Sequence, residues 1–583
     1  MDPSLTAGFG KSKNRSEIFK SFRGYRRFTR YGIGFLTIFF LLLLLPILPK
    51  VSTFHSDETF YTDAAIQMLK TGDYISPYYP NGSLRSNKPI LTYWIIVIGY
   101  KLFGMNYFGS RIGFLIAGCL VIVITYKTSL TLFQHRMDAL LSVILLIANI
   151  LLFEISLRST PDILQCLFSS ISLYGFINLI FGRSRLTRHY LMAYFGAALS
   201  IETKGFLGIF PVLYAFLFCL LYKSSGVKLR GLIHLRIMTG ALVVAALWYA
   251  ALYMKHGETA FQGFINDQVG SRFTGSKFYI LYNLRDYLLA LMKHFLPWTI
   301  FLLAGILRGK KPIADFLQKH KGKVIFSCGW YLLLLLVFIN GNMQRNRYLL
   351  PAYPLLAVLF ASVLMKIRRD IKLSILSYRI FILILLLGSI GGAFFFLSGM
   401  IIHPRILAAG IFLLLISAAL FYFVLAKKRI PIFPALGIYF LIIYSLTNIF
   451  VKPVFKVSPA RELTQCIMNS AKKESGSIPV WSMDQDTRLN YKLFGQISVF
   501  SEGRINFHPL PSAKVSQKPV KPLILLTENY AQKTDLRDYL LKPCGFMLKS
   551  LTPKDIYDML KNRSREPVFS RIKQTIYLAI KRE

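Results

Sequence analysis

The sequence predicts an all-helical protein that crosses a membrane about thirteen times and carries a small α/β domain at its carboxyl end. Hydrophobic residues make up 54% of the 583 residues and charged residues only 17%, whereas about 25% of the residues in soluble globular chains are charged. The hydrophobic residues are grouped in long runs. A run of roughly 20 apolar residues is the length that an α-helix needs to cross a bilayer.

The first apolar run covers residues 31–48 and follows a segment with eight Lys and Arg residues. Pro46, Pro49 and Lys50 follow this run in place of a small-residue cleavage site, so we interpret it as an uncleaved first span and not as a signal peptide. The other predicted spans are residues 109–132, 139–156, 163–181, 190–200, 205–222, 237–254, 287–307, 324–339, 348–365, 379–398, 406–426 and 430–450.

The charge distribution predicts how these spans are oriented. A formal net charge of +43 first suggests a nucleic-acid partner, but no basic helix with base-reading side chains is visible. The basic residues instead concentrate in alternate loops: the predicted cytoplasmic segments hold 29 of them in 84 positions, and the intervening outer loops hold 12 in 99. This asymmetry follows the positive-inside rule. We therefore expect no nucleic acid, a cytoplasmic amino terminus and an extracytoplasmic carboxyl tail in the plasma (inner) membrane.

The region 190–222 leaves two alternatives, one long tilted helix or two short spans. A single helix would invert every later span and would place the lysine-rich loop 308–323 on the outer side. The loop charges therefore favour two spans.

The chain divides into three predicted parts: a basic amino terminus (1–30), the membrane domain (31–450) and a soluble tail (451–583). In the tail we expect a helix over 459–473, strands at 478–481, 496–500 and 522–527, and then helices, which together indicate a small α/β domain. The tail has no Gly-rich phosphate loop and no metal-ligand spacing, so we expect a structural or lid role. The six cysteines of the chain show no CxxC spacing, and four lie in apolar runs.

The polar residues that could carry chemistry gather in the predicted outer loops. The first outer loop (51–108) contains Asp57, Glu58, Arg85 and Lys88, and we expect two helices in it to lie along the membrane surface, at 61–69 and 89–103. The later outer loops add further ionisable side chains, namely Arg158, Asp162, Lys204, Arg272, Arg345 and Arg347. Charged side chains are costly in lipid, so those near a membrane are expected to face a polar site.

The two kinds of charge suit one reaction. An aspartate can accept a proton from an attacking hydroxyl group, and Lys and Arg side chains can neutralise a phosphate. Carboxylates and cations that lie together at a membrane surface favour a reaction whose leaving group is a lipid phosphate. Such electrostatic stabilisation is usually the largest contribution to catalysis of this kind.

Short motifs in consistent order over about residues 31–365 resemble those of the GT-C membrane glycosyltransferases, specifically the superfamily of aminoarabinose transferases and protein O-mannosyltransferases. The motifs are Asp57-Glu58-Thr59, Gly72-Asp73-Tyr74, Lys88-Pro89 with Tyr93-Trp94, Arg158 to Asp162, Lys204-Gly205, Arg272-Phe273, Pro297-Trp298, and Arg347-Tyr348 with Pro351 and Pro354. The resemblance implies transfer of a sugar from a polyprenyl-phosphate carrier to a lipid, glycan or protein acceptor on the outer face.

The resemblance also implies roles for individual residues. Asp57 is the catalytic base or acceptor-orienting residue, with Glu58 beside it and Asp162 assisting. The donor phosphate is bound by cationic side chains, and aromatic rings line the pocket. The residues implied are Lys88, Arg85, Lys204, Arg272 and Arg347 for the phosphate, and Tyr61, Tyr93 and Tyr348 for the pocket.

Two positions depart from the family pattern. Phe60 stands where family members commonly have Arg, and Asn87 stands where they have Glu. The first change weakens the phosphate site, and Arg85 is a candidate to supply the missing charge. The second change weakens the case for a metal there. The residues specify no cofactor, and a divalent cation stays open as an alternative.

Other interpretations remain open at this stage. Asp57 and Glu58 could cap a helix, as could Asp162 after Pro161, because acidic residues favour helix N-termini. Lys88 could reach the membrane surface without binding a ligand. The alternative function is a polytopic transporter or flippase of lipid-linked sugars. Transporter sites lie near the bilayer midplane in repeated, broken helices, whereas these acids lie at the outer ends of spans and no repeat is visible.

Overall fold

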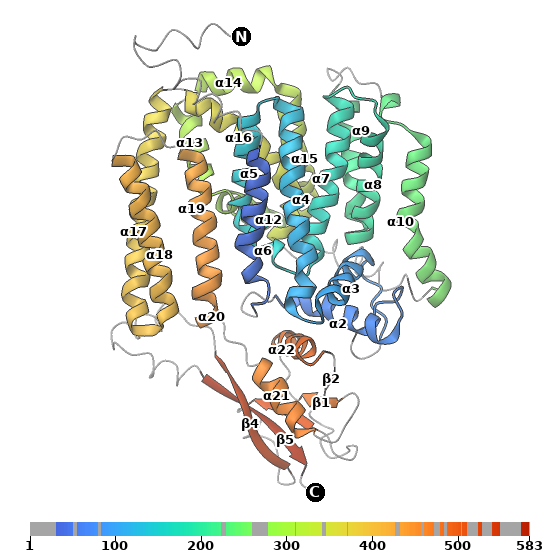
Figure 1. Ribbon diagram of the computed structural model, residues 1–583. Helices are drawn as coiled ribbons and strands as arrows, with labels where there is room; N and C mark the ends of the chain where they lie inside the picture. Colours follow the sequence, from blue (N-terminus) through green and yellow to red (C-terminus); the bar gives the residue numbers. More distant parts are fainter. Residues whose placement is uncertain are drawn as a thin grey trace.

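The computed structural model describes most of the chain as a helical bundle with a smaller α/β unit at one end (Figure 1). The described residues are 31–50, 55–79, 83–222, 229–258, 260, 278–308, 310–340, 345–369, 371–425, 432–455, 460–471, 478–482, 487–502, 504–509, 523–527, 539–548 and 573–581.

The bundle begins with an apolar helix at Tyr31–Ile47 and ends with α20 at Lys452–Phe455. The helices between them are α2 Ser56–Thr71, α3 Leu91–Phe103, α4 Tyr107–Phe133, α5 Arg136–Ile147, α6 Ile150–Ser156, α7 Pro161–Ile180, α8 Thr187–Lys204, α9 Phe210–Leu221, α10 Leu235–His256, α12 Phe278–His294, α13 Trp298–Arg308, α14 Lys310–Lys319, α15 Lys321–Ile339, α16 Tyr353–Arg369, α17 Ile371–Ile402, α18 Pro404–Leu425 and α19 Ile432–Leu446. Short 3-10 segments, among them η4 Gly205–Ile209 and η8 Asn346–Ala352, connect some of these helices.

The lengths of these helices agree with a polytopic membrane protein. Among the described residues, nine helical segments are long and apolar enough to cross a membrane, with Thr187–Leu221 counted as one segment, and the number rises to 11 if each of two bent helix pairs is one span. The helix at Tyr31–Ile47 is apolar but shorter. These numbers are consistent with the thirteen predicted spans.

The helical segment 187–221 folds back on itself. At the end of α8, Lys204 Nζ lies 2.6 Å from Oδ1 of Asp162 at the start of α7. Near the end of α9, the ring centroid of Phe218 lies 5.9 Å from that of Phe181, which follows the far end of α7. Since α8 runs antiparallel along α7, a straight continuation beyond Lys204 would carry Phe218 away from Phe181. The contacts therefore favour the two predicted spans over a single long helix.

The predicted span 287–307 is not one straight helix. The segments Ile280–His294 and Trp298–Leu307 meet at an angle of 102°, and the predicted span 139–156 is also bent, by 66°, between α5 and α6. Pro297 lies at the first bend, and a proline removes a helix hydrogen bond and clashes with the preceding turn. Hydropathy alone did not indicate either bend.

The two helices predicted along the membrane surface are present in the first outer loop. Helix α2 is longer than the predicted 61–69, and α3 is a 13-residue helix, too short to cross a bilayer. Figure 1 places both helices at the end of the bundle that faces the tail, while α14 lies across the opposite end.

The tail contains a mixed five-stranded sheet with the strand order β2-β1-β3-β5-β4. The strands are β1 Ile478–Ser482, β2 Ile505–Pro509, β3 Leu523–Thr527, β4 Tyr539–Leu548 and β5 Lys573–Lys581, and two helices accompany them, α21 Ala460–Ser470 and α22 Thr487–Phe500. Strand β1 pairs in parallel with β2 and β3, whereas β5 pairs antiparallel with β3 and β4. This architecture is consistent with the predicted α/β tail.

Two predictions for the tail are wrong. Residues 496–500 form the end of α22 and not a strand, because Leu493, Ile497 and Phe500 continue a helical repeat that a five-residue window does not reveal. Residues 539–548 and 573–581, where helices were predicted, are strands. Strand β5 lies between β3 and β4, so backbone pairing with distant strands decides its conformation.

A disulfide joins Cys466 of α21 to Cys544 of β4, with the two Cα atoms 5.6 Å apart. The cysteine spacing in the sequence did not indicate this bond, because the two residues are 78 positions apart. The other four cysteines are free and lie in the bundle.

Candidate active site

Charged side chains from four segments meet at the end of the bundle that faces the tail. They come from the first turns of α2 and α7, the last residue of α8 and the start of η8. We refer to Asp57, Asp162, Lys204, Arg345 and Arg347 as the charge cluster. All but Arg345 were predicted site residues.

Arg347 links the two aspartates of the charge cluster. Its guanidinium group forms an ion pair with the Asp57 carboxylate, and its Nε lies 3.5 Å from Oδ2 of Asp162. Arg345 Nη1 donates to Asp57 Oδ2 at 2.8 Å, and Lys204 Nζ donates to Asp162 Oδ1 at 2.6 Å. The structure thus brings together residues that are up to 290 positions apart in the chain.

Helix ends explain why these side chains occupy their positions. Asp57 and Asp162 lie in the first turns of α2 and α7, and Lys204 is the last residue of α8. Acidic side chains are stabilised at helix N-termini and basic ones at C-termini. Pro161 fixes the first position of α7, where a proline is well tolerated. The capping interpretation and the site interpretation are therefore compatible.

The charge cluster changes from buried to accessible across its width. The side chains of Asp162 and Lys204 are 3% and 8% exposed, whereas those of Asp57 and Arg345 are 23% and 38% exposed. Burial alone would raise the pKa of Asp57, but the neighbouring Arg347 and Arg345 outweigh burial and lower it below its ordinary value. With three cations and two carboxylates, the cluster carries one net positive charge and favours an anionic ligand.

The predicted pocket tyrosines fall into two places. Tyr348 lies next to the charge cluster, with the Lys204 ammonium group 4.7 Å from its ring centroid. Tyr61 and Tyr93 are buried, with ring centroids 5.4 Å apart. Both of these rings face Arg85.

Arg85 is enclosed by aromatic rings. Its guanidinium carbon lies 4.6 to 5.6 Å from the ring centroids of four residues, Phe60, Tyr61, Tyr79 and Tyr93. The guanidinium group also donates to the backbone carbonyl of Phe60. Arg85 therefore packs on Phe60. No ion pair joins Arg85 to the charge cluster among the residues described.

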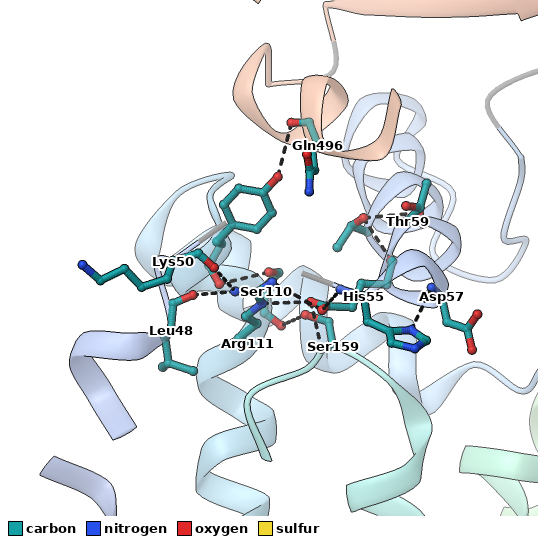
Figure 2. Close-up of polar contacts among 12 residues, drawn as sticks. Leu48, Lys50, His55, Asp57, Thr59, Ser110, Arg111, Ser159 and Gln496 are labelled. Atoms are coloured by element: carbon teal, nitrogen blue, oxygen red, sulfur yellow. Dashed lines mark hydrogen bonds and ion pairs between the residues drawn. The ribbon is translucent and has the colours of Figure 1, made fainter. Parts of the chain in front are cut away.

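Glu58 does not join Asp57 in the charge cluster. Figure 2 shows the hydrogen-bond network around Arg111, in which Arg111 Nε donates to Glu58 Oε2 at 2.8 Å. Both side chains are completely buried. Glu58 also accepts hydrogen bonds from the backbone amides of His55 and Ser159. These contacts connect the start of α2, helix α4 and the loop before α7, so Glu58 lies apart from the charge cluster in this structure.

Two further predicted phosphate ligands, Lys88 and Arg272, are not seen in the charge cluster among the described residues. Lys88 is half-buried in the turn before α3, at the same end of the bundle. Arg272 lies outside the described residues.

Sequence reasoning did not assign a role to Arg111, which also donates to the backbone carbonyls of Leu48 and Lys50. A single arginine inside the apolar run 109–132 was the available signal, because ionisable residues in such runs usually have a defined partner. Arg345 was recognised as an outer-loop cation only. Within the described part of the chain, no group of three or more His, Cys, Asp or Glu side chains is arranged to hold a metal ion.

Known proteins share this sequence pattern and fold. Residues 87–249 match the family described as dolichyl-phosphate-mannose-protein mannosyltransferase. The chain is 26% identical over 338 residues to the undecaprenyl phosphate-alpha-4-amino-4-deoxy-L-arabinose arabinosyl transferase of Erwinia tasmaniensis, which covers 58% of this chain and 59% of that protein. It is also 26% identical over 437 residues to an uncharacterized protein of Aquifex aeolicus, with coverage of 73% and 81%. The chain thus spans less than two thirds of the arabinosyl transferase.

The fold agrees with these matches. The crystal structure of ArnT from Cupriavidus metallidurans bound to undecaprenyl phosphate superposes with a TM-score of 0.68 and 15% identity, over 94% of this chain and 98% of that chain. The same protein in the apo state gives a TM-score of 0.66. The sequence matches and the fold similarity together support a GT-C membrane glycosyltransferase of the aminoarabinose transferase and protein O-mannosyltransferase type.

Proposed function

We propose that the protein transfers a sugar from a polyprenyl-phosphate carrier to an acceptor on the outer face of the membrane, with inversion at the anomeric carbon. One observation carries this proposal: two aspartates and three cations meet at one end of the bundle, linked by Arg347. The carboxylates suit activation of an acceptor, and the excess positive charge suits a phosphate leaving group.

In the proposed reaction, Asp57 accepts the proton of the acceptor nucleophile or orients it. The nucleophile forms a bond to the anomeric carbon while the bond from that carbon to the carrier phosphate oxygen breaks. The electron pair of the broken bond stays on the polyprenyl phosphate, whose negative charge is neutralised by Arg345, Arg347 and Lys204. Asp162 holds Lys204 and Arg347 in place through its two ion pairs.

The donor phosphate also affects the basicity of Asp57. Without a donor, Arg347 and Arg345 lower the pKa of Asp57, which makes the carboxylate a weak base. A phosphate that binds these arginines competes with Asp57 for them. We expect the pKa of Asp57 to rise when the donor binds, so that the base is strongest when the substrate is present.

Lys88, Arg272 and Arg85 remain predicted contributors to the phosphate site, and Tyr348 to the pocket. The acceptor class stays open between a lipid, a glycan and a protein. Mass spectrometry of envelope glycolipids and glycoproteins, with and without the gene, identifies the acceptor and the sugar. An assay with and without EDTA tests the alternative that a divalent cation takes part.

The central test is the substitution Asp57→Asn, which keeps the size of the side chain and removes its basicity. We expect it to abolish sugar transfer from a radiolabelled polyprenyl-phosphate sugar in membranes at normal expression. Asp286→Asn serves as the control, because Asp286 is partly exposed and its only ion pair among the residues described is with the adjacent Arg285. An Asp57→Asn protein that transfers sugar at the wild-type rate would rule out the proposed mechanism.

We also propose that the tail and the charge cluster lie outside the plasma (inner) membrane, with the amino terminus in the cytoplasm. The Cys466–Cys544 disulfide supports this orientation, because disulfides persist mainly in oxidising compartments. A membrane-impermeant maleimide should label these cysteines in intact spheroplasts only after reduction. Labelling that requires permeabilised membranes would contradict the orientation.

The transporter alternative has less support. The charge cluster lies at the ends of α2, α7 and α8, whereas transporter sites lie near the bilayer midplane. A reconstituted protein that moves a lipid-linked sugar across liposomes without forming a glycosylated product would favour that alternative.

A further inference from the structure

His55 precedes α2 and forms its N-cap, directly beside the charge cluster. Its backbone is extended, with φ −110° and ψ 142°. Its Nδ1 accepts a hydrogen bond from the backbone amide of Asp57 at 3.2 Å, and its own amide donates to Glu58 Oε1 at 2.9 Å. This reciprocal arrangement is a capping box. Figure 2 shows the imidazole ring beside the Asp57 side chain, with a dashed line to the Asp57 backbone nitrogen.

The cap determines which ring nitrogen of His55 carries the proton. A nitrogen that accepts a hydrogen bond from an amide N–H has no proton of its own, so a neutral imidazole with Nδ1 as acceptor has its proton on Nε2. The second nitrogen of the half-buried ring is therefore a hydrogen-bond donor.

The charges around His55 favour a neutral ring and an anionic neighbour. Burial lowers the pKa of His55, and the cations Arg158 and Arg347 lower it further, against the opposing effect of Asp57 and Glu58. The N-terminus of α2 adds a partial positive charge at the same place. An anion is attracted to this environment, and a neutral N–H group can donate to that anion without acquiring a proton.

Capping alone does not require a histidine at this position. Ser, Thr, Asp and Asn are the preferred N-cap residues, and each would accept the hydrogen bond from the Asp57 amide. None of them presents a second nitrogen on the far side of a ring. The histidine thus supplies a donor in addition to the cap.

We propose that His55 is a further substrate-binding residue, whose Nε2–H donates a hydrogen bond to an anionic oxygen of the donor phosphate while Nδ1 holds the first turn of α2. This inference rests on the proposed function. It adds an uncharged donor beside Arg345 and Arg347 and couples phosphate binding to the backbone that carries Asp57.

Two substitutions separate the donor from the cap. His55→Ser retains a side-chain acceptor for the helix and removes the distal donor, whereas His55→Ala removes both. His234→Ser is the matched control, because His234 is the N-cap residue of α10 and makes no side-chain capping hydrogen bond. The probe is undecaprenyl phosphate without a sugar, and its affinity is measured on the purified full-length protein in detergent, together with the thermal stability of the ligand-free protein.

We expect His55→Ser to bind undecaprenyl phosphate roughly ten- to a hundredfold more weakly than the wild type, the usual effect of losing a hydrogen bond to a charged group, at nearly unchanged thermal stability. His55→Ala should lose the same affinity and also some stability, and His234→Ser should bind normally. Wild-type affinity in His55→Ser, with weaker binding in His55→Ala alone, would show that His55 is only a cap and would overturn the inference.

The Asp57→Asn variant distinguishes failure of the inference about His55 from failure of the proposed function. If Asp57→Asn binds the probe but does not transfer sugar, while His55→Ser binds normally, only the inference about His55 fails. If the wild-type protein does not bind undecaprenyl phosphate, the proposed function and the inference fail together.

Discussion

Adjacent acidic residues at the start of α2 have opposite surroundings, although the sequence presents them as a pair. The Asp57 side chain is 23% exposed and faces two arginines of the accessible charge cluster. Glu58 is completely buried against Arg111 and accepts hydrogen bonds from two backbone amides. One residue along a helix rotates the side chain by about 100°, so the two carboxylates face different parts of the protein.

The buried pair predicts a large effect on stability. Arg111→Met should destabilise the protein by about 3–5 kcal/mol, because the Glu58 charge would remain buried without its partner. Glu154→Gln should cost only about 0.3–1 kcal/mol, since Glu154 forms partly exposed ion pairs with Arg158 and Lys452. Thermal unfolding of both purified variants measures the difference. Equal midpoints for the two variants would contradict the role assigned to Arg111.

At the scale of elements, the hairpin of α8 and α9 places Lys204 beside Asp162. The hairpin depends on a close approach of two backbone segments at Gly208. A Cβ atom at Gly208 would lie 2.2 Å from the backbone nitrogen of Ile201 and 2.5 Å from the carbonyl carbon of Ser200. Only a glycine fits there without movement of the backbone.

We therefore expect Gly208→Ala to move the end of α8, to weaken the Lys204–Asp162 ion pair and to lower transfer activity at least tenfold. Gly240→Ala is the matched control in a neighbouring helix, because its Cβ would meet only the Phe195 ring at 3.6 Å, an ordinary contact distance. Activity per folded protein, measured after size-exclusion chromatography in detergent, tests the pair. The structural account of the hairpin fails if Gly208→Ala and Gly240→Ala behave alike.

At the scale of the whole molecule, the tail packs against the helix that carries Asp57. Figure 1 shows α22 next to α2, between the bundle and the sheet. The Tyr107 ring of α4 lies 5.3 Å from the Phe500 ring, and its hydroxyl group donates to the Gln496 carbonyl at 3.5 Å. The tail thus contacts both α2 and α4.

A buried acid at this contact predicts a dependence on pH. Burial raises the pKa of Asp63 in α2 to about 7, although the hydroxyl group of Ser498 and the charge of Arg85 oppose this rise. Tyr100 and Tyr107 also face the carboxyl group. Since the pKa is higher in the folded state than in the unfolded chain, the stability of the contact is greatest below about pH 4, falls as the pH rises towards 7 and is constant above that value.

The rate at which trypsin releases the tail measures this dependence. We expect faster release at pH 8 than at pH 6 in the wild type, after correction for trypsin activity on an unfolded substrate. Asp63→Asn should show no such change, because its side chain does not titrate. The same pH dependence in both proteins would assign the effect to another group.

Local features of the sequence determined the membrane bundle and predict that the candidate site residues lie on the outer side. Apolar runs predict spans and loop charges predict their orientation, since both depend on neighbouring residues only. The same reasoning favoured two spans in 190–222 and selected Asp57, Asp162, Lys204 and Arg347. It did not indicate that Glu58 is buried against Arg111.

Only the tertiary structure decided which of these residues meet. The ion pairs of Asp57 with Arg345 and Arg347 join residues 288 and 290 positions apart, and no local pattern encodes such a separation. The same holds for strand β5, which forms between two strands of the sheet, and for the Cys466–Cys544 disulfide. Hydropathy and helix propensity act over a few turns of chain, whereas ion pairs, sheet pairing and disulfides require the folded arrangement that brings distant segments together.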